Sequence, residues 1–468
     1  MTADVSQNAS WLSPDRSVPD IRTPVPGPKA QAVLERDAAV TSPSLPRVYP
    51  LVPNRGSGSV VEDADGNLFL DFNAGIAVNS TGHCHPRVVE AVRSQAERLL
   101  HYSASDFYLP IYSQMCEALT AVLPISGHKR VFLTNSGAEA VEGAMKLTRY
   151  ATGRPFIISF FGAFHGRTYG AVSLTASKAK YHKGFAPLLP GILHAPYAFS
   201  QRDPDTGKRT HDEEATFDYL ENTLFRYQVP PTEVAAIFLE PVLGEGGYIV
   251  PPASWVQRLR ALGDKYGILL VADEVQSGMG RTGKMWAIEL ADVEPDILIS
   301  AKGIASGLPL GAFAARTELM ERWGAGAHGS TYGGSPVPCA AGLATLETIA
   351  AENLTDNATK VGEELLSGLG ELATRFPHTV TDVRGVGLMI GVEFRTGEQA
   401  EAVQQQAFAR AGEDVAAHSA TAATESPKIR RAVWACSRVT TNGGDMRMVL
   451  SPHSRTRSPC SKASCCTA

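Results

Sequence analysis

The sequence predicts an α/β fold, with a large domain built on a mostly parallel sheet and a smaller α+β domain. Between about residues 105 and 340, short apolar runs alternate with segments of helical periodicity, which is typical of a parallel sheet with helices on both faces. The 43 glycines and 44% hydrophobic residues fit a globular chain with many tight turns. From about residue 341 to 411 the pattern changes to two long helical segments and a strand, which indicates the second domain.

The segments that precede the sheet differ from it in composition. Residues 1–30 are rich in Pro, Ser, Asp and Ala and have no apolar periodicity, so we expect a mobile arm there. Residues 31–104 are expected to join the small domain. Within them, Val60–Asp71 predicts a hairpin that turns at Asp65-Gly66-Asn67, and Pro86–Leu100 predicts a helix with one apolar face.

The sheet and the second domain are predicted from apolar runs and from helical periodicity. The strand candidates are Val131–Thr134, Phe156–Phe160, Ala235–Leu239, Ile268–Ala272 and Ile297–Ser300. In the second domain we expect helices over Ala341–Ala351 and Thr359–Phe376 and a strand near Val386–Phe394.

Charge and composition exclude several classes of partner. The net charge of −5 and the pI near 6.2 provide no basic field for nucleic acid or an anionic membrane. No window reaches the roughly 20 apolar residues of a membrane span, and the amino terminus lacks the features of a secretory signal. The cysteines have no metal-ligand spacing, so we expect no metal site, and the first three are best read as reduced thiols of a cytoplasmic protein.

The composition breaks near the carboxyl terminus. From about Gly412 the apolar periodicity vanishes, and four of the seven cysteines follow Arg431. Residues 412–468 are therefore either a disordered extension or the product of a shifted reading frame over the last ~55 residues, and we favour the second interpretation. Resequencing the coding DNA decides between the two.

Two ionisable residues follow apolar strand candidates directly. Asp273 comes after Ile268–Ala272, and Lys302 follows Ile297–Ser300 within two residues. The carboxyl ends of parallel strands open into the ligand crevice, so both side chains are expected to face one ligand. An aspartate for a pyridinium nitrogen and a lysine for a Schiff base are what pyridoxal 5'-phosphate (PLP) requires. A single lysine at a strand end is usually a surface residue, but the ordered pair indicates a PLP enzyme.

Other motifs are ambiguous when each is taken alone. Ser136-Gly137-Ala138 precedes a helix and suits an anion, although such a segment is more often a plain cap. Phe164 can stack on a planar cofactor and Arg167 can hold a carboxylate, but a core Phe and a surface Arg are the commoner reading. Glu245, on a glycine-flanked loop, is as well explained as a solvated acid. Gln276 lies three residues after Asp273 and is placed to donate to the phenolic oxygen of the ring.

Taken together, the motifs resemble those of the class III aminotransferases. They are N-S-G-A-E-A, F-H-G-R-T, E-P-V-L-G-E-G-G, D-E-V-Q-S-G-M-G-R-T-G, S-A-K-G-I-A-S-G-L-P-L-G and G-G-S-P, preceded by the entry motif Asp71–Pro86. The resemblance covers about residues 25–410 and is strongest to the 4-aminobutyrate and acetylornithine aminotransferase group. It implies the fold-type I architecture of PLP enzymes, with a mostly parallel seven-stranded sheet over residues 105–340. It also implies a homodimer, or a tetramer, with active sites at the subunit interface.

The resemblance also implies a role for each site residue. Lys302 would be the Schiff-base lysine and proton shuttle, and Asp273 would pair with the pyridinium nitrogen. The remaining cofactor contacts would come from Gln276 on the phenolic oxygen, Val275 and Phe164 on the two ring faces, Ser136, Gly137 and Ala138 on the phosphate, and Thr331 from the partner subunit. Substrate would be held by Ile76, Arg167 and Glu245, and Glu245 would pair with a carboxyl-terminal arginine for which Arg447 is the nearest candidate.

The implied reaction is the transfer of an amino group from an ω-amino donor to 2-oxoglutarate. With 4-aminobutyrate, the leading donor, the products would be the semialdehyde and glutamate; N-acetylornithine is the runner-up. Aminomutases and decarboxylating enzymes are near relatives in chemistry, and Glu245 argues against an aminomutase because a switching glutamate serves two alternating substrates. A PLP-binding protein impaired by the altered carboxyl terminus is the alternative from a different class.

Overall fold

The computed structural model describes residues 11–12, 16–198 and 211–410. Its centre is a seven-stranded sheet in the order β4-β10-β9-β8-β7-β5-β6. The strands are β4 (Lys129–Thr134), β5 (Phe156–Phe160), β6 (Ile192–Ala195), β7 (Val234–Leu239), β8 (Leu269–Asp273), β9 (Ile297–Ser300) and β10 (Gly311–Arg316). Strand β10 is antiparallel to both of its neighbours, and the other pairings are parallel. The predicted mostly parallel, seven-stranded sheet is therefore confirmed.

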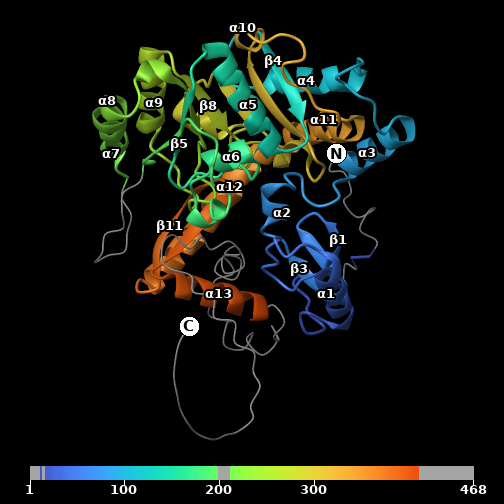
Figure 1. Cartoon of the computed structure of the whole chain (residues 1–468). Coiled ribbons are helices and arrows are strands. Elements are labelled where there is room, and N and C mark those ends of the chain that lie inside the picture. Colours follow the sequence, from blue (N-terminus) through green and yellow to red (C-terminus); the bar gives the residue numbers. More distant parts are fainter. Residues whose placement is uncertain (1–10, 13–15, 199–210, 411–468) are drawn as a thin grey trace, which may run out of the picture.

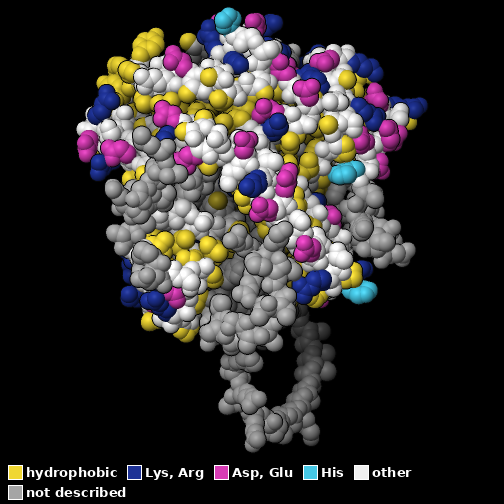
Figure 2. Space-filling model, turned by 180° about the vertical axis from the view of Figure 1, so that it is seen from behind, with side chains coloured by type: hydrophobic (Ala, Val, Ile, Leu, Met, Phe, Trp, Pro, Cys, Tyr) yellow, Lys and Arg dark blue, Asp and Glu magenta, His cyan; other side chains and the backbone are white. Residues whose placement is uncertain are grey.

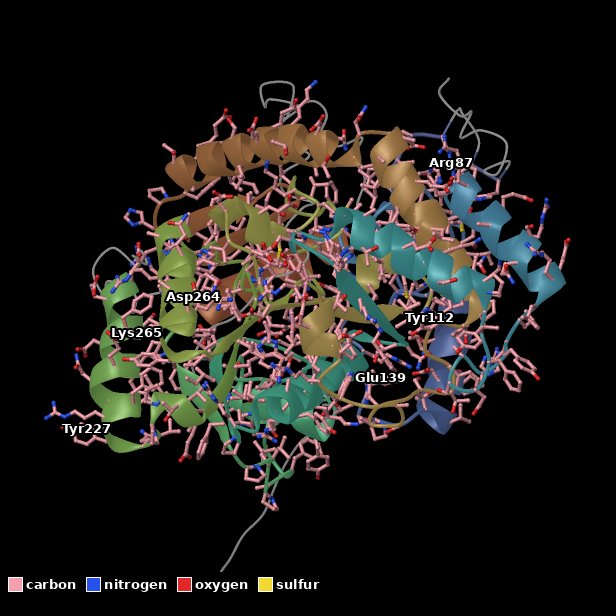
Figure 3. All side chains as sticks on the ribbon, turned by 90° about the horizontal axis from the view of Figure 1, so that it is seen from above. Arg87, Tyr112, Glu139, Tyr227, Asp264 and Lys265 are labelled. Carbon is pink, nitrogen blue, oxygen red and sulfur yellow. The ribbon has the colours of Figure 1, made fainter. Side chains whose placement is uncertain are left out.

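Alternate residues of the central strands enter two separate cores, one on each face of the sheet. Ile158 and Ile237 belong to one core, and Ile157 and Phe238 to the other, because successive side chains of a strand point to opposite faces. Side chains fill the space between the sheet and its helices (Figure 3). The helices of this domain are α4 (Pro110–Val122), α5 (Gly137–Thr152), α6 (Tyr169–Leu174), α7 (Glu213–Asp218), α8 (Phe225–Tyr227), α9 (Ala253–Tyr266), α10 (Thr317–Met320) and α11 (Pro336–Ala351).

Short 3-10 and π turns connect these elements. They span Ala179–Tyr181, Tyr219–Leu224, Pro231–Glu233, Ala287–Ala291 and Lys302–Ala305. The last of them begins directly at the lysine predicted from the strand pattern.

Most of the amino-terminal segment forms a lobe below the sheet in Figure 1. The lobe contains α1 (Pro28–Val40), β1 (Pro53–Ser57), β2 (Val60–Asp63), β3 (Leu68–Leu70) and α2 (Ala74–Ala77). The next helix, α3 (Pro86–Arg98), instead lies beside α11 of the large domain. The predicted hairpin is confirmed as the antiparallel pair β2 and β3, and its turn is closed because the Asp63 carboxylate accepts from the Asn67 backbone N–H. Two residues of the segment 1–30, where a mobile arm was expected, contact this hairpin. Asp20 forms an antiparallel β-bridge with Leu68, and the backbone N–H of Thr23 donates to the Asn67 side chain.

The carboxyl-terminal lobe contains α12 (Leu354–Arg375), β11 (Val380–Val386), β12 (Met389–Phe394) and α13 (Gly397–Arg410). The strand expected near Val386–Phe394 is confirmed as β12. Strand β11 was not predicted, and the two strands form an antiparallel hairpin that turns at Gly387 and Leu388. The strong turn potential of Gly385 and Gly387, both with positive φ, is the physical reason. The tail 412–468, with Arg447, lies outside the described residues.

The surface and the helices agree with the composition. On the face shown in Figure 2, basic and acidic side chains are interspersed, as a net charge of −5 suggests. Among the described residues, no helix has the length and apolar character needed to cross a membrane.

Candidate active site

A cavity of about 570 Å³ opens at the carboxyl ends of the central strands. It brings together predicted residues from distant parts of the chain, namely Ile76, Ser136, Gly137, Ala138, Phe164, Arg167, Glu245, Asp273, Val275, Gln276 and Lys302. Two predicted residues are not among those that line it. Thr331 is exposed outside the cavity, and Arg447 falls beyond the described part of the chain.

Lys302 follows β9 in a strained backbone conformation. Its φ is 49°, a left-handed value that a non-glycine residue adopts at a cost of roughly 1–3 kcal/mol and mostly at functional sites. The next residue, Gly303, leaves no room for a side chain, because a Cβ there would lie 2.5 Å from Ser80 Oγ. The turn that presents the Lys302 amine to the cavity therefore depends on close backbone packing.

Asp273 is the last residue of β8 rather than the first residue after it, and only 4% of it is exposed. One carboxylate oxygen lies 2.7 Å from His165 Nδ1, and the other accepts from the Val275 backbone N–H at 3.1 Å. Burial lowers the pKa of His165, but the hydrogen bond and the charge of Asp273 outweigh burial, so the net pKa is raised. His165 Nε2 lies 3.2 Å from Ser159 Oγ, which completes a buried chain of three polar groups.

Ser136, Gly137 and Ala138 open α5 at the end of β4. Ser136 is the N-cap, and its side chain accepts from the Glu139 backbone N–H at 3.3 Å. A Cβ on Gly137 would lie 2.9 Å from both methyl carbons of Val275, so only glycine allows this close approach. The positive end of a helix of 16 residues faces the cavity here, and that arrangement favours an anion.

The opposite side of the cavity carries aromatic and charged groups. The rings of Phe164 and Tyr181 meet edge to face at 5.4 Å, and the Arg167 guanidinium lies 5.0 Å from the centroid of the Tyr181 ring. Glu245 accepts from Lys178 Nζ at 3.3 Å and from Tyr181 Oη at 3.5 Å. Arg167 and Glu245 thus line this side of the cavity, and Lys178 and Tyr181 contact Glu245 there.

A buried acid supports the aromatic side of the cavity. The Glu240 carboxylate accepts from the backbone N–H groups of Phe164 at 2.8 Å and Gly244 at 3.2 Å. Burial raises the pKa of Glu240 to about 7. Glu240 thus joins the loop after β5 to the loop after β7.

The sequence analysis gave no role to four residues at this site. His165 and Glu240 line the cavity, and Lys178 and Tyr181 contact Glu245. His165 and Glu240 could have been found, because each belongs to a motif that also contains a predicted site residue, F-H-G-R-T or E-P-V-L-G-E-G-G. Lys178 and Tyr181 come from a segment without any motif, and nothing in the local pattern distinguishes them from surface residues.

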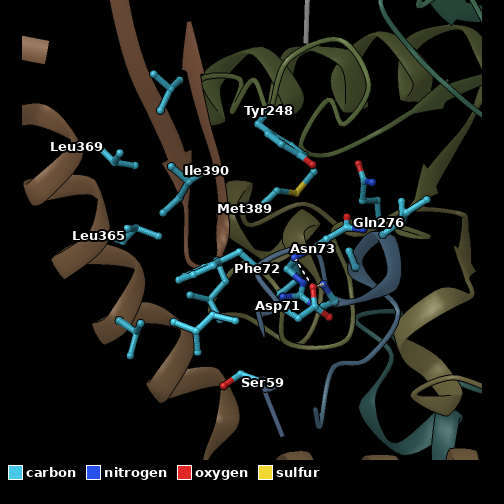
Figure 4. A pocket seen from close by; sticks show the side chains of 18 of the residues that line it. Ser59, Asp71, Phe72, Asn73, Tyr248, Gln276, Leu365, Leu369, Met389 and Ile390 are labelled. Carbon is cyan, nitrogen blue, oxygen red and sulfur yellow. Dashed lines mark hydrogen bonds between the residues drawn. The ribbon is translucent and has the colours of Figure 1, made fainter. Parts of the chain in front are cut away.

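A second cavity of about 430 Å³ adjoins the first and shares Ile76 and Gln276 with it. Figure 4 shows Leu365 and Leu369 of α12 and Ile390 of β12 on its apolar side and Asp71 on its polar side. Asp71 is held by His83 Nε2 at 2.6 Å.

The groups around the first cavity match the parts of PLP. The α5 terminus suits a phosphate, Val275 and Phe164 offer apolar surfaces for a flat ring, Asp273 offers a buried carboxylate, and Lys302 offers an amine. Comparison with known proteins agrees with this match: the family model for class III aminotransferases covers residues 42–418. The chain belongs to the class III aminotransferases. Its cofactor is accordingly PLP.

Several characterised relatives are similar over most of this aminotransferase-family chain. An alanine/serine racemase of Pyrococcus horikoshii is 42% identical over 380 residues, which is 80% of each chain. A 4-aminobutyrate aminotransferase of Mycobacterium tuberculosis is 40% identical over 79% of this chain and 83% of the relative. An acetylornithine aminotransferase of Methanothermobacter thermautotrophicus is 43% identical over 74% of this chain and 81% of the relative.

Solved structures agree in fold. The ornithine aminotransferase of Toxoplasma gondii has a TM-score of 0.71 and 31% identity, covering 81% of this chain and 85% of the other. An amine transaminase from an uncultivated Pseudomonas species, in its PLP-bound form, has a TM-score of 0.70 and 33% identity over 78% of this chain and 89% of the other. The family match ends at residue 418, close to the change of composition near Gly412.

Proposed function

We propose that the protein transfers the amino group of an ω-amino acid, 4-aminobutyrate first of all, to 2-oxoglutarate, with the semialdehyde and glutamate as products. The observation that carries this proposal is the cavity that joins Lys302 and Asp273 to Arg167 and Glu245. The similarity to 4-aminobutyrate aminotransferases supports the choice of donor.

The residues of the cavity have distinct roles in this proposal. Lys302 would hold the cofactor through its amine and move the proton next to the donor nitrogen. Asp273 would pair with the ring nitrogen, and His165 would orient Asp273. Gln276 would bond the phenolic oxygen, and Val275 and Phe164 would pack on the ring. The cofactor, when bound, would supply the electron sink of the reaction.

Substrate and phosphate contacts complete the assignment. Arg167 holds a substrate carboxylate, Ile76 lines the substrate pocket, and Glu245 responds to the second substrate. Ser136, Gly137 and Ala138 would hold the phosphate, and Thr331 would reach it from the partner subunit of a homodimer. We place the enzyme in the cytoplasm, since the cysteines in the described residues are free thiols.

The central test is a donor screen combined with replacement of Lys302. We expect glutamate to form from 2-oxoglutarate with 4-aminobutyrate as donor, and Lys302→Ala to lower the rate by at least about a thousandfold because the amine nucleophile is lost. Glutamate is measured by an enzyme-linked assay. The matched control is Lys284→Ala, an exposed lysine outside the cavity. A Lys302→Ala variant that still forms a borohydride-reducible bond to the cofactor would contradict the assignment.

Assays on the same purified protein distinguish the proposed activity from the alternatives. N-acetylornithine turning over faster than 4-aminobutyrate would identify the acetylornithine type, and absorbance of bound cofactor without reaction with any donor would indicate an impaired PLP-binding protein. The 42% identity to an alanine/serine racemase favours one more candidate. To test for racemase activity, the protein is incubated with L-alanine or L-serine without any oxo acid, and chiral chromatography then measures the D-enantiomer that forms.

A further inference from the structure

We propose that the second cavity is a binding site for a medium-chain carboxylate. The carboxylate group of the ligand pairs with Arg281, and its hydrocarbon chain lies against the apolar side chains of α12 and β12 that line the cavity. An amphiphilic ligand of this kind matches the two kinds of surface that the cavity presents. The proposal does not depend on which amino donor the enzyme uses.

Arg281 is a buried cation without an ionic partner among the described residues. It lines the second cavity, and within the described part of the chain its Nε is buried without a hydrogen bond. Burial lowers the pKa of Arg281, which reflects the cost of holding its charge away from water. Because buried charges in proteins are normally paired, the guanidinium is placed to receive an anion.

Asp71 also lines this cavity, but its carboxylate already serves other groups. One oxygen lies 2.6 Å from His83 Nε2, and the other accepts from the backbone N–H groups of Asn73 at 2.8 Å and Ala74 at 2.9 Å. These contacts hold the start of the turn Ala74–Ala77, whose residues have φ values from 48° to 70°, a region that residues with a side chain seldom adopt. Asp71 is therefore committed to the turn, and an external carboxylate can take the guanidinium.

Another part of the cavity wall is apolar. Leu365 and Leu369 of α12 and Ile390 of β12 line it (Figure 4), and Leu388 and Val392 extend the same surface. The cavity volume of about 430 Å³ is sufficient for a small-molecule ligand. Each methylene group buried there raises affinity by roughly fourfold, so the wall favours a chain of several carbons over a short acid.

The second cavity shares a wall with the active-site cavity but offers a different cation. Ile76 and Gln276 line both cavities. Arg281 lines only the second cavity, whereas Arg167 and Lys302 line only the first. A carboxylate on Arg281 therefore occupies a site that the proposed transamination does not use.

The test is calorimetric binding of octanoate to the full-length protein with PLP bound. We expect octanoate to bind at least about tenfold more tightly than butyrate, because its additional methylene groups are buried. Arg281→Met should lower octanoate affinity by about tenfold or more, since a charge-assisted contact is lost, and Arg281→Lys should restore part of it. Octanamide has a similar shape and no charge, so Arg281→Met should change its affinity by less than about threefold.

Two control variants place the ligand. Lys284→Met removes an equal charge from an exposed position three residues along the chain, and Arg167→Met removes the cation of the first cavity. Both variants should bind octanoate as the parent protein does. A loss of octanoate binding in Arg167→Met that is absent in Arg281→Met would put the ligand in the active site and overturn the proposal.

A further variant tests the apolar wall and leaves the buried cation in place. Leu365 is partly exposed on α12, so Leu365→Phe should be tolerated by the fold while the larger ring narrows the cavity. We expect it to weaken octanoate binding by about fivefold or more and to change butyrate binding less. Failure of the parent protein to bind octanoate, or equal affinities for octanoate and butyrate, would also overturn the proposal.

Discussion

At the scale of single residues, burial raises the pKa of two acids at or next to the site, Glu240 and Glu274. Burial raises the pKa of Glu274 from 4.5 to about 7, and Glu240 shows the same effect. The Glu274 carboxyl accepts from the Ile288 backbone N–H at 2.7 Å and from the Ser277 hydroxyl. The backbone N–H groups of Ile288 and Ala287 and the Ser277 hydroxyl thus interact with Glu274, and of these only the hydroxyl can also accept, whereas both oxygens of Glu240 face backbone N–H groups.

We predict that Glu274→Gln makes the stability of the protein less dependent on pH. Because the folded pKa lies above the unfolded one, the contribution of Glu274 is fully present below about pH 4.5 and is lost as the pH rises to about 7. The loss amounts to about 3 kcal/mol. The neutral amide fits the same contacts, since it accepts from Ile288 and donates to Ser277. The apparent unfolding temperature should therefore decline less from pH 4.5 to 7 in the variant, and Glu363→Gln on the exposed face of α12 should behave like the parent.

At the scale of elements, the phosphate cradle depends on how closely α5 packs on β10. Gly143 of α5 faces Phe313 of β10, and a Cβ at Gly143 would lie 2.3 Å from the Phe313 ring. The glycine therefore lets the helix approach the sheet and places Ser136, Gly137 and Ala138 at the cavity. The sequence pattern identified the helix but gave no sign of this approach.

We predict that Gly143→Ala destabilises the protein by about 1–3 kcal/mol because the added methyl overpacks the core. The displacement of α5 should also weaken PLP binding, measured by cofactor release during dialysis. Gly370→Ala in α12 is the control, because a Cβ there meets nothing within 4 Å and the substitution should be neutral or stabilise by up to about 1 kcal/mol. Equal effects of the two substitutions in urea unfolding would show that the packing argument is wrong.

At the scale of the whole molecule, one exposed apolar segment is the candidate surface for the proposed homodimer. Between α3 and α4, Leu100 is 66% exposed and Tyr108 is fully exposed, and large apolar side chains gathered in this way mark interaction surfaces. The Ser105 hydroxyl donates to the Ser330 carbonyl at 3.1 Å, so the segment lies directly beside Thr331. A second copy seated here would bring its Thr331 toward the partner's site.

We predict that the double variant Leu100→Asp, Tyr108→Asp is monomeric, because two charges would be buried at the interface. Sedimentation velocity measures the change, and PLP should dissociate more readily without the partner's Thr331. Tyr227→Asp is the control: this residue is 71% exposed on α8 and is labelled at the outer edge of the molecule in Figure 3. A double variant that stays dimeric would exclude this surface.

Most strands of the sheet could be predicted from the pattern of apolar residues, and the two strands that were missed have physical explanations. All five predicted strands of the sheet exist, because short apolar runs of four or five residues mark strands that are buried in a sheet. Strand β6 was missed because His194 interrupts its apolar run. Strand β10 was missed because Gly-Ala-Phe-Ala-Ala-Arg is rich in small residues, whose low β-propensity hides a strand that is stabilised by pairing on both sides.

The sequence by itself determined the strands, the capped helix and the position of Asp273 and Lys302 at the carboxyl ends of their strands, since these depend on residue type and short-range period. Only the tertiary structure decided which groups meet. His165 and Asp273 are 108 residues apart in the chain, and Lys178 and Glu245 are 67 apart. Such contacts depend on the path of the whole chain, and a local pattern carries no information about that path.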